Sequence, residues 1–320
     1  MHGGKTLDKR RSAKYVRRPQ VTRLQKRSQH PLAREQPVRE LVNIYQQGGV
    51  RGAFDAIVVQ PWGRIDESYR GKNCGALTAR QAAFTTFVTV CLCLTFLRFV
   101  VMDRDIQAGV ASLLCEFVGL FSSDGRELMY RYHRLLVNCS WVIGCAMCYF
   151  VVPSAIIKIV FRQTLADHFL APRHYFSHLW IYALLFAPVG LLVVVFSASP
   201  DFLSQYPFYK DQNGWIDLLT WELAYGIQFF CLEFFFRGFM LRGFANELGS
   251  MAVLIMAIPY CMIHFGKPLP ECLGSIIAGT VLGVLALDTR SIWGGVTIHV
   301  AVAWAMDFSA LWQKGVLQRL

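Results

Sequence analysis

The first twenty residues lack the apolar run that forms the core of a secretory signal peptide, so we expect no signal peptide here. Large aliphatic side chains stay scarce through residue 40, where basic and polar residues dominate. A segment of this composition buries too little apolar surface to offset the entropy lost on ordering. The sequence therefore predicts a disordered basic arm over residues 1–40.

Acidic residues are also scarce in this arm. Residues 1–40 contain 12 Lys and Arg against 3 Asp and Glu, a net charge of +9, and the whole chain carries +11, so the other 280 residues carry +2. An excess of basic residues can indicate a nucleic-acid-binding protein. Here the excess is confined to an arm beside apolar segments, where it attracts anionic lipid. We expect anionic lipid, and no nucleic acid, as the partner of the arm.

Charged residues make up only 17% of the chain and hydrophobic residues 54%, with a mean hydropathy of +0.38. Soluble domains contain about 45–50% apolar residues, so this composition predicts a lipid bilayer as the environment. A run of about 20 apolar residues crosses a bilayer. The segments that reach or approach this length are 82–102, 135–157, 178–198, 217–241, 250–265, 272–287 and 291–311. We expect an all-α, polytopic transmembrane helix bundle of about seven spans.

The segments between the spans predict organisation and orientation. Residues 41–80 mix charged and apolar positions, as in an amphipathic helix on the membrane surface, and the short apolar segment 105–122 predicts a second interfacial helix. Basic residues after the second and fourth spans fall on the side of the arm: Lys158, Arg162, Arg173 and Arg242. Because cytoplasmic loops are rich in Lys and Arg, we expect an integral membrane protein with a cytoplasmic N-terminus. The remaining chain divides into N-terminal transmembrane helices at 81–200 and a core at 201–320.

Most of the ten cysteines lie in apolar stretches, where free thiols pack as small hydrophobic side chains. Cys145 and Cys148 have the spacing of a redox or zinc pair, but no second pair and no nearby His accompany them. We expect free thiols at these positions.

Ionisable side chains inside the late spans are the candidates for chemistry, because such groups are costly in a bilayer. Glu233 and Arg237 are four residues apart and share one helix face. His264 ends the fifth predicted span and His299 lies in the seventh. A self-neutralising ion pair and histidines that only pack between helices are the structural alternatives. One carboxylate and two histidines on three neighbouring helices favour a site.

The sequence around these residues resembles the CPBP family of intramembrane proteases, also called the CAAX-protease and bacteriocin-processing or ABI family. The resemblance covers about residues 217–307 and rests on LEFFFRGF at 232–239, YCMIHFGKPLPE at 260–271, TRSIW at 289–293 and IHVAVAW at 298–304. The family pattern is EExxxR, then FxxxH, then HxxxN, on consecutive membrane helices. The resemblance implies that Glu233, Arg237, His264 and His299 are the site residues, with Tyr260 at the aromatic position.

Two positions depart from the family pattern. Leu232 stands where the family has its first glutamate, and Ala303 stands where it has asparagine. In the family, the first glutamate activates water. Its replacement bears directly on whether this chain hydrolyses a peptide bond.

The resemblance implies an intramembrane endopeptidase that cleaves near the C-terminus of a membrane-associated protein or peptide. Glu233 would act as the base for water, Arg237 would position it, His264 would orient the water, and His299 would donate to the carbonyl oxygen. The substrate would be a hydrophobic or membrane-tethered peptide or protein; family members cut prenylated CAAX termini, bacteriocins or sorting tails. The alternative is a catalytically silent relative that acts as a peptide-binding, scaffold or immunity protein, which Leu232 and Ala303 favour.

The same residues also raise the question of a metal. Two histidines and Glu233 have the ligand count of a catalytic zinc site with water in the fourth position. Arg237, four residues from Glu233, would repel a cation held there. We expect no cofactor, with zinc as the alternative.

Overall fold

The helices of this chain follow the apolar runs of the sequence. The computed structural model describes residues 49, 51–52, 55, 59–172 and 175–319, and within these ranges the chain is helical with no strand. The predicted disordered arm at 1–40 lies outside the described residues, as do residues 41–48, 50, 53–54 and 56–58 of the predicted surface segment at 41–80. The part of that segment that is described includes α3 (Gln60–Tyr69), a helix that begins with Pro61 in its first turn.

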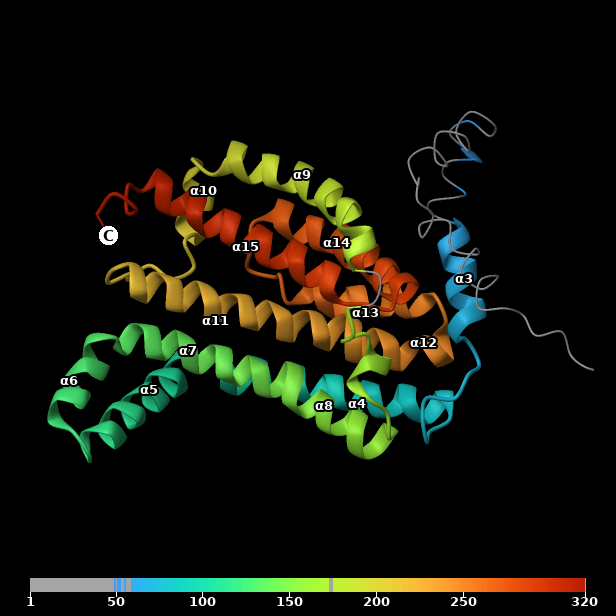
Figure 1. The fold of residues 1–320 in the computed structure, drawn as a ribbon, viewed down its shortest axis with the longest axis horizontal. Coiled ribbons are helices and arrows are strands. Elements are labelled where there is room, and N and C mark those ends of the chain that lie inside the picture. The colour runs from blue at the N-terminus through green and yellow to red at the C-terminus, as the bar shows by residue number, and fades with distance from the viewer. Residues whose placement is uncertain (1–48, 50, 53–54, 56–58, 173–174, 320) are drawn as a thin grey trace, which may run out of the picture. The chain divides into compact units, whose positions relative to one another are not determined.

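The helices run in the following order. They are α4 (Ala79–Phe96), η3 (Leu97–Val101), α5 (Arg104–Gly119), α6 (Ser123–Arg131), α7 (His133–Ala146), η4 (Met147–Val151), α8 (Val152–Ile156), η5 (Ile157–Phe161), η6 (Leu165–His168), η7 (Phe176–His178), α9 (Leu179–Phe196), α10 (Pro200–Gln205), α11 (Trp215–Glu233), η8 (Phe234–Leu241), α12 (Arg242–Leu248), α13 (Met251–Met262), α14 (Leu269–Thr289) and α15 (Trp293–Gln313). In Figure 1, α11 runs between α7 and α15, and both helices contact it. The core therefore lies along α11.

Five helices among the described residues are long and apolar enough to cross a membrane, by length and composition: Ala79–Val101, His133–Phe161, Leu179–Phe196, Leu269–Thr289 and Trp293–Gln313. They coincide with five of the seven predicted spans. The exposed side chains of α9 include Leu184, Leu191 and Val194, as expected for a helix that faces lipid. The all-α, polytopic membrane fold is thus confirmed.

The sequence predicts seven membrane spans, whereas five helices meet the criterion of length and apolar composition among the described residues. The predicted span at 250–265 falls on α13, which has 12 residues. Such a helix rises only about 18 Å, against about 30 Å for the hydrocarbon core. The predicted span at 217–241 falls on α11 and η8, and α11 carries three carboxylates, Asp217, Glu222 and Glu233, all buried. These carboxylates lower the hydropathy of α11 and face protein neighbours instead of lipid.

The interior around the end of α11 is aromatic. Phe234, Phe235, Phe236 and Phe239 are all fully buried in η8, a π-helical continuation of α11. The ring of Phe236 lies 5.3 Å from that of Tyr260 on α13. Short π-helical segments are frequent at functional sites because they change the direction of the side chains that follow.

The segment 105–122, which we expected to be an interfacial helix, forms the helix α5, while its position at a membrane surface stays a prediction. All ten cysteines are free thiols, as expected.

The loop before α9 connects two elements that carry site residues. His168 is fully buried, and its Nδ1 bonds the carbonyl oxygen of Gly238 in η8 at 2.8 Å. The Ile292 amide donates to the Phe169 carbonyl at 3.1 Å, and Trp293 Nε1 donates to the Leu170 carbonyl at 2.7 Å. The loop thereby holds η8 and the start of α15 together.

His168 should make the stability of this connection depend on pH. Burial, together with the nearby Arg242 guanidinium, lowers the pKa of His168 to about 3, whereas an exposed histidine titrates near 6.5. Below about pH 6.5, His168 therefore binds a proton in the unfolded chain, whereas in the folded chain it stays neutral until the pH approaches 3. Stability present above that pH should be lost as the pH falls toward 3, by about 1.4 kcal/mol per pH unit.

The measurement is the thermal unfolding midpoint of the purified protein in detergent from pH 7.5 to 4.5. The control is His168→Gln, which keeps a neutral polar side chain and has no proton to gain. The fall in midpoint with acidification should be smaller in the variant. Equal slopes for both proteins would show that His168 does not contribute.

Candidate functional site

The predicted site residues on α11, η8 and α15 form one buried charged cluster. Glu233 ends α11, Arg237 lies one turn further in η8, and both side chains are 1% exposed or less. Glu233 Oε1 lies 3.1 Å from Arg237 Nη1 and 2.7 Å from His299 Nδ1. The packing of α11 on α15 therefore brings together residues that are 66 positions apart in the chain.

Tyr260 on α13 joins the remaining predicted residue to this cluster. Its ring centroid lies 4.1 Å from the Arg237 guanidinium carbon, a cation–π contact. Its hydroxyl is 3.3 Å from His299 Nε2, and its backbone oxygen is 2.7 Å from His264 Nδ1. Tyr260 thus touches Arg237 and both histidines. Tyr260, at the aromatic position, therefore links His264 to Arg237 and His299, which in turn hold Glu233.

The partners of the two histidines determine where their protons lie. His299 Nδ1 faces a carboxylate oxygen and His264 Nδ1 faces a carbonyl oxygen, and both partners only accept hydrogen bonds. Each neutral ring therefore carries its proton on Nδ1 and has a lone pair on Nε2. His299 accepts from the Tyr260 hydroxyl at that atom, and a neutral His299 has no Nε2 proton to give to a carbonyl oxygen.

The two imidazoles are also the accessible part of the cluster. His299 is 16% exposed while Glu233 is fully buried. The Phe229 ring stacks on His299 with centroids 4.8 Å apart, and it lies one helical turn before Glu233. His264 lies half-buried in the turn after α13. A water molecule or a substrate can therefore reach the two imidazoles without contacting the buried Glu233 carboxylate.

Sequence reasoning missed Gly295. Together with Tyr182, Ser291 and Arg237 it lines a narrow gap beside Glu233. A Cβ atom at position 295 would overlap Glu233 Oε2, so glycine permits the close approach of α15 to the carboxylate. The available signal was the pair Gly294-Gly295 inside a long apolar helix, where glycine costs stability unless close packing requires it.

Replacing Gly295 with alanine should disturb the cluster. Glu233 cannot retreat freely because His299 and Arg237 hold it. We expect Gly295→Ala to destabilise the fold by about 1–3 kcal/mol through overpacking. The control is Gly274→Ala in α14, where a Cβ meets nothing within 4 Å and alanine should keep or raise stability. Thermal unfolding midpoints decide: an equal or higher midpoint for Gly295→Ala would contradict the close approach.

The two positions that depart from the family pattern are apolar inside the fold as well. Leu232 is 5% exposed and belongs to the main hydrophobic core. Ala303 is 4% exposed and packs in a second cluster with Trp221 and Tyr225. Neither position supplies a polar group to the Glu233 cluster.

Two other residues with buried carboxyl groups, Glu222 on α11 and Asp307 on α15, have hydrogen-bond partners of their own outside this cluster. Asp307 Oδ1 accepts from the Phe208 amide at 2.9 Å. Glu222 is 3% exposed, and its backbone oxygen accepts from Trp304 Nε1 at 3.2 Å. No hydrogen bond among the described residues joins either carboxylate to Glu233 or His299. The structure thus provides no substitute for the missing glutamate from these two residues.

A zinc ion in this cluster would need the carboxylate and imidazole groups as free donors. Glu233 Oε1 and His299 Nδ1 bind each other, and the Arg237 guanidinium stands beside the carboxylate. Within the described ranges, no group of three or more His, Cys, Asp and Glu side chains could hold a metal ion. These donors therefore do not fit a zinc ion as they stand, and the absence of a cofactor stays a prediction.

Comparison with known proteins agrees with this region of the chain. Residues 212–305 match the family described as type II CAAX prenyl endopeptidase Rce1-like. The match spans less than a third of the chain and contains Glu233, Arg237, His264 and His299. No curated protein and no solved structure matches the chain.

The fold and this match define the class of protein. The chain is an integral membrane protein, and its residues 212–305 are similar to the Rce1-like family. The resemblance to the CPBP family is confirmed, and the match supports a CAAX-type intramembrane endopeptidase in general.

Proposed function

We propose that this chain is a CAAX-type intramembrane endopeptidase in which Glu233 activates water through His299. The observation that carries the proposal is the 2.7 Å bond between Glu233 Oε1 and His299 Nδ1, inside the segment that matches the protease family. A carboxylate that holds the Nδ1 proton orients the imidazole and stabilises its protonated form. Glu233 is then the source of basicity, and His299 Nε2 is the atom that takes the proton.

The proposed reaction needs only water and the peptide. A water proton moves to His299 Nε2, and the water oxygen attacks the scissile carbonyl carbon. The Nε2 lone pair of His264 accepts the second water hydrogen and so orients the attack. Once His299 Nε2 is protonated, it no longer accepts from the Tyr260 hydroxyl, which lies 3.3 Å away and can donate to the oxyanion.

Collapse of the tetrahedral intermediate completes the reaction. The C–N bond breaks as His299 returns its proton to the leaving amine, which yields a carboxylate and a free C-terminal fragment. Arg237 keeps Glu233 ionised by pairing with the oxygen that binds His299. As expected from the sequence, Glu233 supplies the basicity. In this proposal the water proton moves to His299 Nε2 and not directly to Glu233.

The substrate proposed is a hydrophobic or membrane-tethered peptide with a C-terminal CAAX sequence. His299 lies in the candidate membrane span Trp293–Gln313, and His264 lies in the turn between α13 and the candidate span Leu269–Thr289, so a lipid-anchored peptide is the kind that reaches them. No cofactor takes part in the proposed steps.

A catalytically silent relative remains the second candidate. The observation that favours it is the apolar packing of Leu232 and Ala303, where the family pattern has a water-activating glutamate and an asparagine. In that case the Arg237, Glu233 and His299 cluster would hold the helices together and the Rce1-like domain would bind a peptide without cutting it.

Mass spectrometry of peptide cleavage separates the two candidates. Membranes that contain the wild type, His299→Gln or His133→Gln at matched expression are given peptides ending in a CAAX sequence, with and without a prenyl group on the cysteine. His133 lies at the start of α7, outside the Glu233 cluster, and serves as the matched histidine control. We expect the wild type and the control to release the C-terminal tripeptide from the prenylated peptide, and His299→Gln to release none. Wild type that binds the peptide without cutting it would favour the silent relative.

A further inference from the structure

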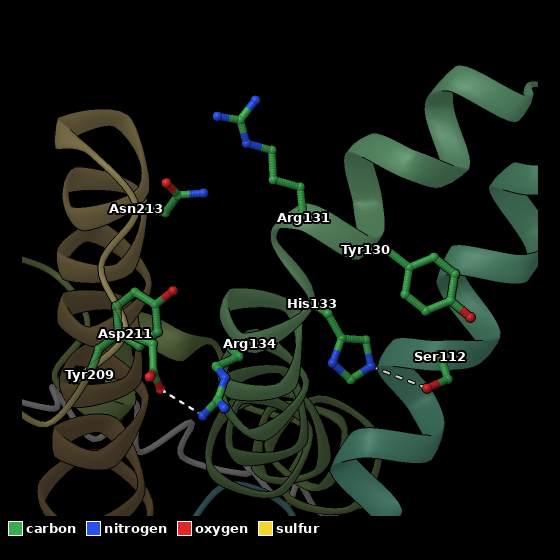
Figure 2. A pocket seen from close by; sticks show the side chains of 8 residues that line it. All are labelled: Ser112, Tyr130, Arg131, His133, Arg134, Tyr209, Asp211 and Asn213. Carbon is green, nitrogen blue, oxygen red and sulfur yellow. Dashed lines mark hydrogen bonds and ion pairs between the residues drawn. The ribbon is translucent and has the colours of Figure 1, made fainter.

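A separate cavity lies on the opposite side of α11 from α15 and has no role in the proposed reaction. Its volume is about 610 Å³. Figure 2 shows it between α5, the junction of α6 and α7, and the loop that precedes α11. It is lined by Ser112, Tyr130, Arg131, His133, Arg134, Tyr209, Asp211 and Asn213. None of these residues belongs to the Glu233 cluster.

The lining carries an excess of positive charge. Arg134 Nη1 pairs with Asp211 Oδ2 at 3.0 Å, so the one acidic group of the lining is already engaged. Arg131 is exposed, and it forms no hydrogen bond or ion pair with any described residue. His133 Nε2 bonds Ser112 Oγ at 3.1 Å on the opposite wall. Guanidinium groups bind phosphate oxygens with paired N–H donors, which makes this lining suited to a phosphate.

The position of the cavity indicates where such a phosphate would come from. The membrane-spanning segment His133–Phe161 begins at the cavity, so Arg131 and Arg134 lie at the end of a span. Phosphate groups of a bilayer lie just outside its hydrocarbon core. Tyr130 is 46% exposed, as is typical of aromatic side chains at the membrane interface.

The surface beside the cavity is apolar. The helix α5, whose Ser112 lines the cavity, exposes Leu113 at 71% and Phe117 at 59%. The turn that follows exposes Leu120 and Phe121 at 79% and 78%. The rings of Phe117 and Phe121 lie 5.4 Å apart, and an exposed apolar surface of this kind needs an apolar partner. Acyl chains could cover it while the phosphate of the same molecule occupies the cavity, and a free phosphate ion could not.

We propose that this cavity binds the headgroup of an anionic phospholipid, with Arg131 and Arg134 holding the phosphate. The volume is in the range of small-molecule sites, about 300–1,000 Å³, and exceeds what a single phosphate ion needs. The ligand has the chemistry of a phosphodiester with attached acyl chains. This binding site is independent of whether the Glu233 cluster cleaves peptides.

The test compares lipids and variants of the full chain purified in neutral detergent, with binding measured by native mass spectrometry. The probes are phosphatidylglycerol, phosphatidylcholine of the same acyl length, and inorganic phosphate. The variants are Arg131→Gln and Arg134→Gln. The matched control is Arg126→Gln, which removes the same charge from α6 at a residue that pairs with Glu116 and does not line the cavity. Lipid bound by the basic arm contributes equally to all of these proteins.

We expect phosphatidylglycerol to bind the wild type and Arg126→Gln alike, and to bind Arg131→Gln about tenfold more weakly, the loss of one charge-assisted contact. Phosphatidylcholine and inorganic phosphate should bind the wild type at least about tenfold more weakly than phosphatidylglycerol. Arg131 has no hydrogen-bond or ion-pair partner in the part of the chain that the structure describes, so its variant should fold even where Arg134→Gln does not. Equal binding of the two lipids, unchanged binding by Arg131→Gln, or inorganic phosphate that saturates the site as readily as the lipid would each overturn the proposal.

Discussion

Glu233→Gln is expected to lower the rate of peptide cleavage by roughly 10²–10⁴-fold, the usual contribution of acid–base catalysis. The amide oxygen can still accept the Nδ1 proton of His299, but it carries no charge to stabilise the imidazolium that forms when Nε2 takes the water proton. Binding of the prenylated peptide should change little, because Glu233 is fully buried and does not reach the substrate. The measurement is kcat and KM in detergent with a prenylated CAAX peptide.

The wild type and Glu233→Gln must be compared as folded proteins, because the variant leaves the Arg237 guanidinium buried without a counter-charge. Thermal unfolding of each sample supplies this control. A folded Glu233→Gln protein that cleaves at the wild-type rate would show that Glu233 is a structural ion-pair partner only.

Arg237→Met is expected to be the most destabilising of the substitutions considered, by about 3–5 kcal/mol. The reason is that the Glu233 carboxylate would stay buried without the guanidinium that lies 3.1 Å away. Methionine fills a similar length without charge, so packing against the Tyr260 ring is partly kept. The measurement is the thermal unfolding midpoint in detergent.

The double variant Glu233→Gln, Arg237→Met separates charge balance from catalysis. It removes both charges of the buried pair, so most of the lost stability should return, since replacing a whole buried pair is far less costly than breaking it. Cleavage should stay lost because no carboxylate remains beside His299. A double variant as unstable as Arg237→Met would show that the ion pair is not the cause of the destabilisation.

The membrane fold was predictable because hydropathy and length are properties of contiguous sequence. Each predicted span falls on a helix, and five helices meet the length and composition of a membrane crossing. The prediction of seven exceeded this count at two places. The helix α13 ends after 12 residues, and α11 carries Asp217, Glu222 and Glu233 into the protein interior. A count of apolar residues cannot separate a helix that faces lipid from one that faces other helices.

The disordered arm, its anionic lipid partner and the cytoplasmic N-terminus stay predictions from the charge pattern. So does the division of the chain into four segments. The catalytic roles of the site residues, and the absence of a cofactor, are likewise open to the experiments above.

The sequence by itself determined the residue types of the candidate site. The spacing of Glu233 and Arg237 places both on one helix face, and the order of the motifs places His264 and His299 on helices that follow. These are local properties, because a helix has a fixed rise and rotation per residue. The match of 212–305 to an Rce1-like family rests on the same local patterns.

Only the tertiary structure decided which atoms meet. Glu233 Oε1 binds His299 and not His264, Tyr260 contacts Arg237 and both histidines, and Gly295 gives α15 room beside the carboxylate. The cavity at the start of α7 likewise combines α5, α6 and a loop about 80 residues further along the chain. These contacts depend on how helices pack against one another, and the distance between two helices depends on every side chain between them, which no single motif contains.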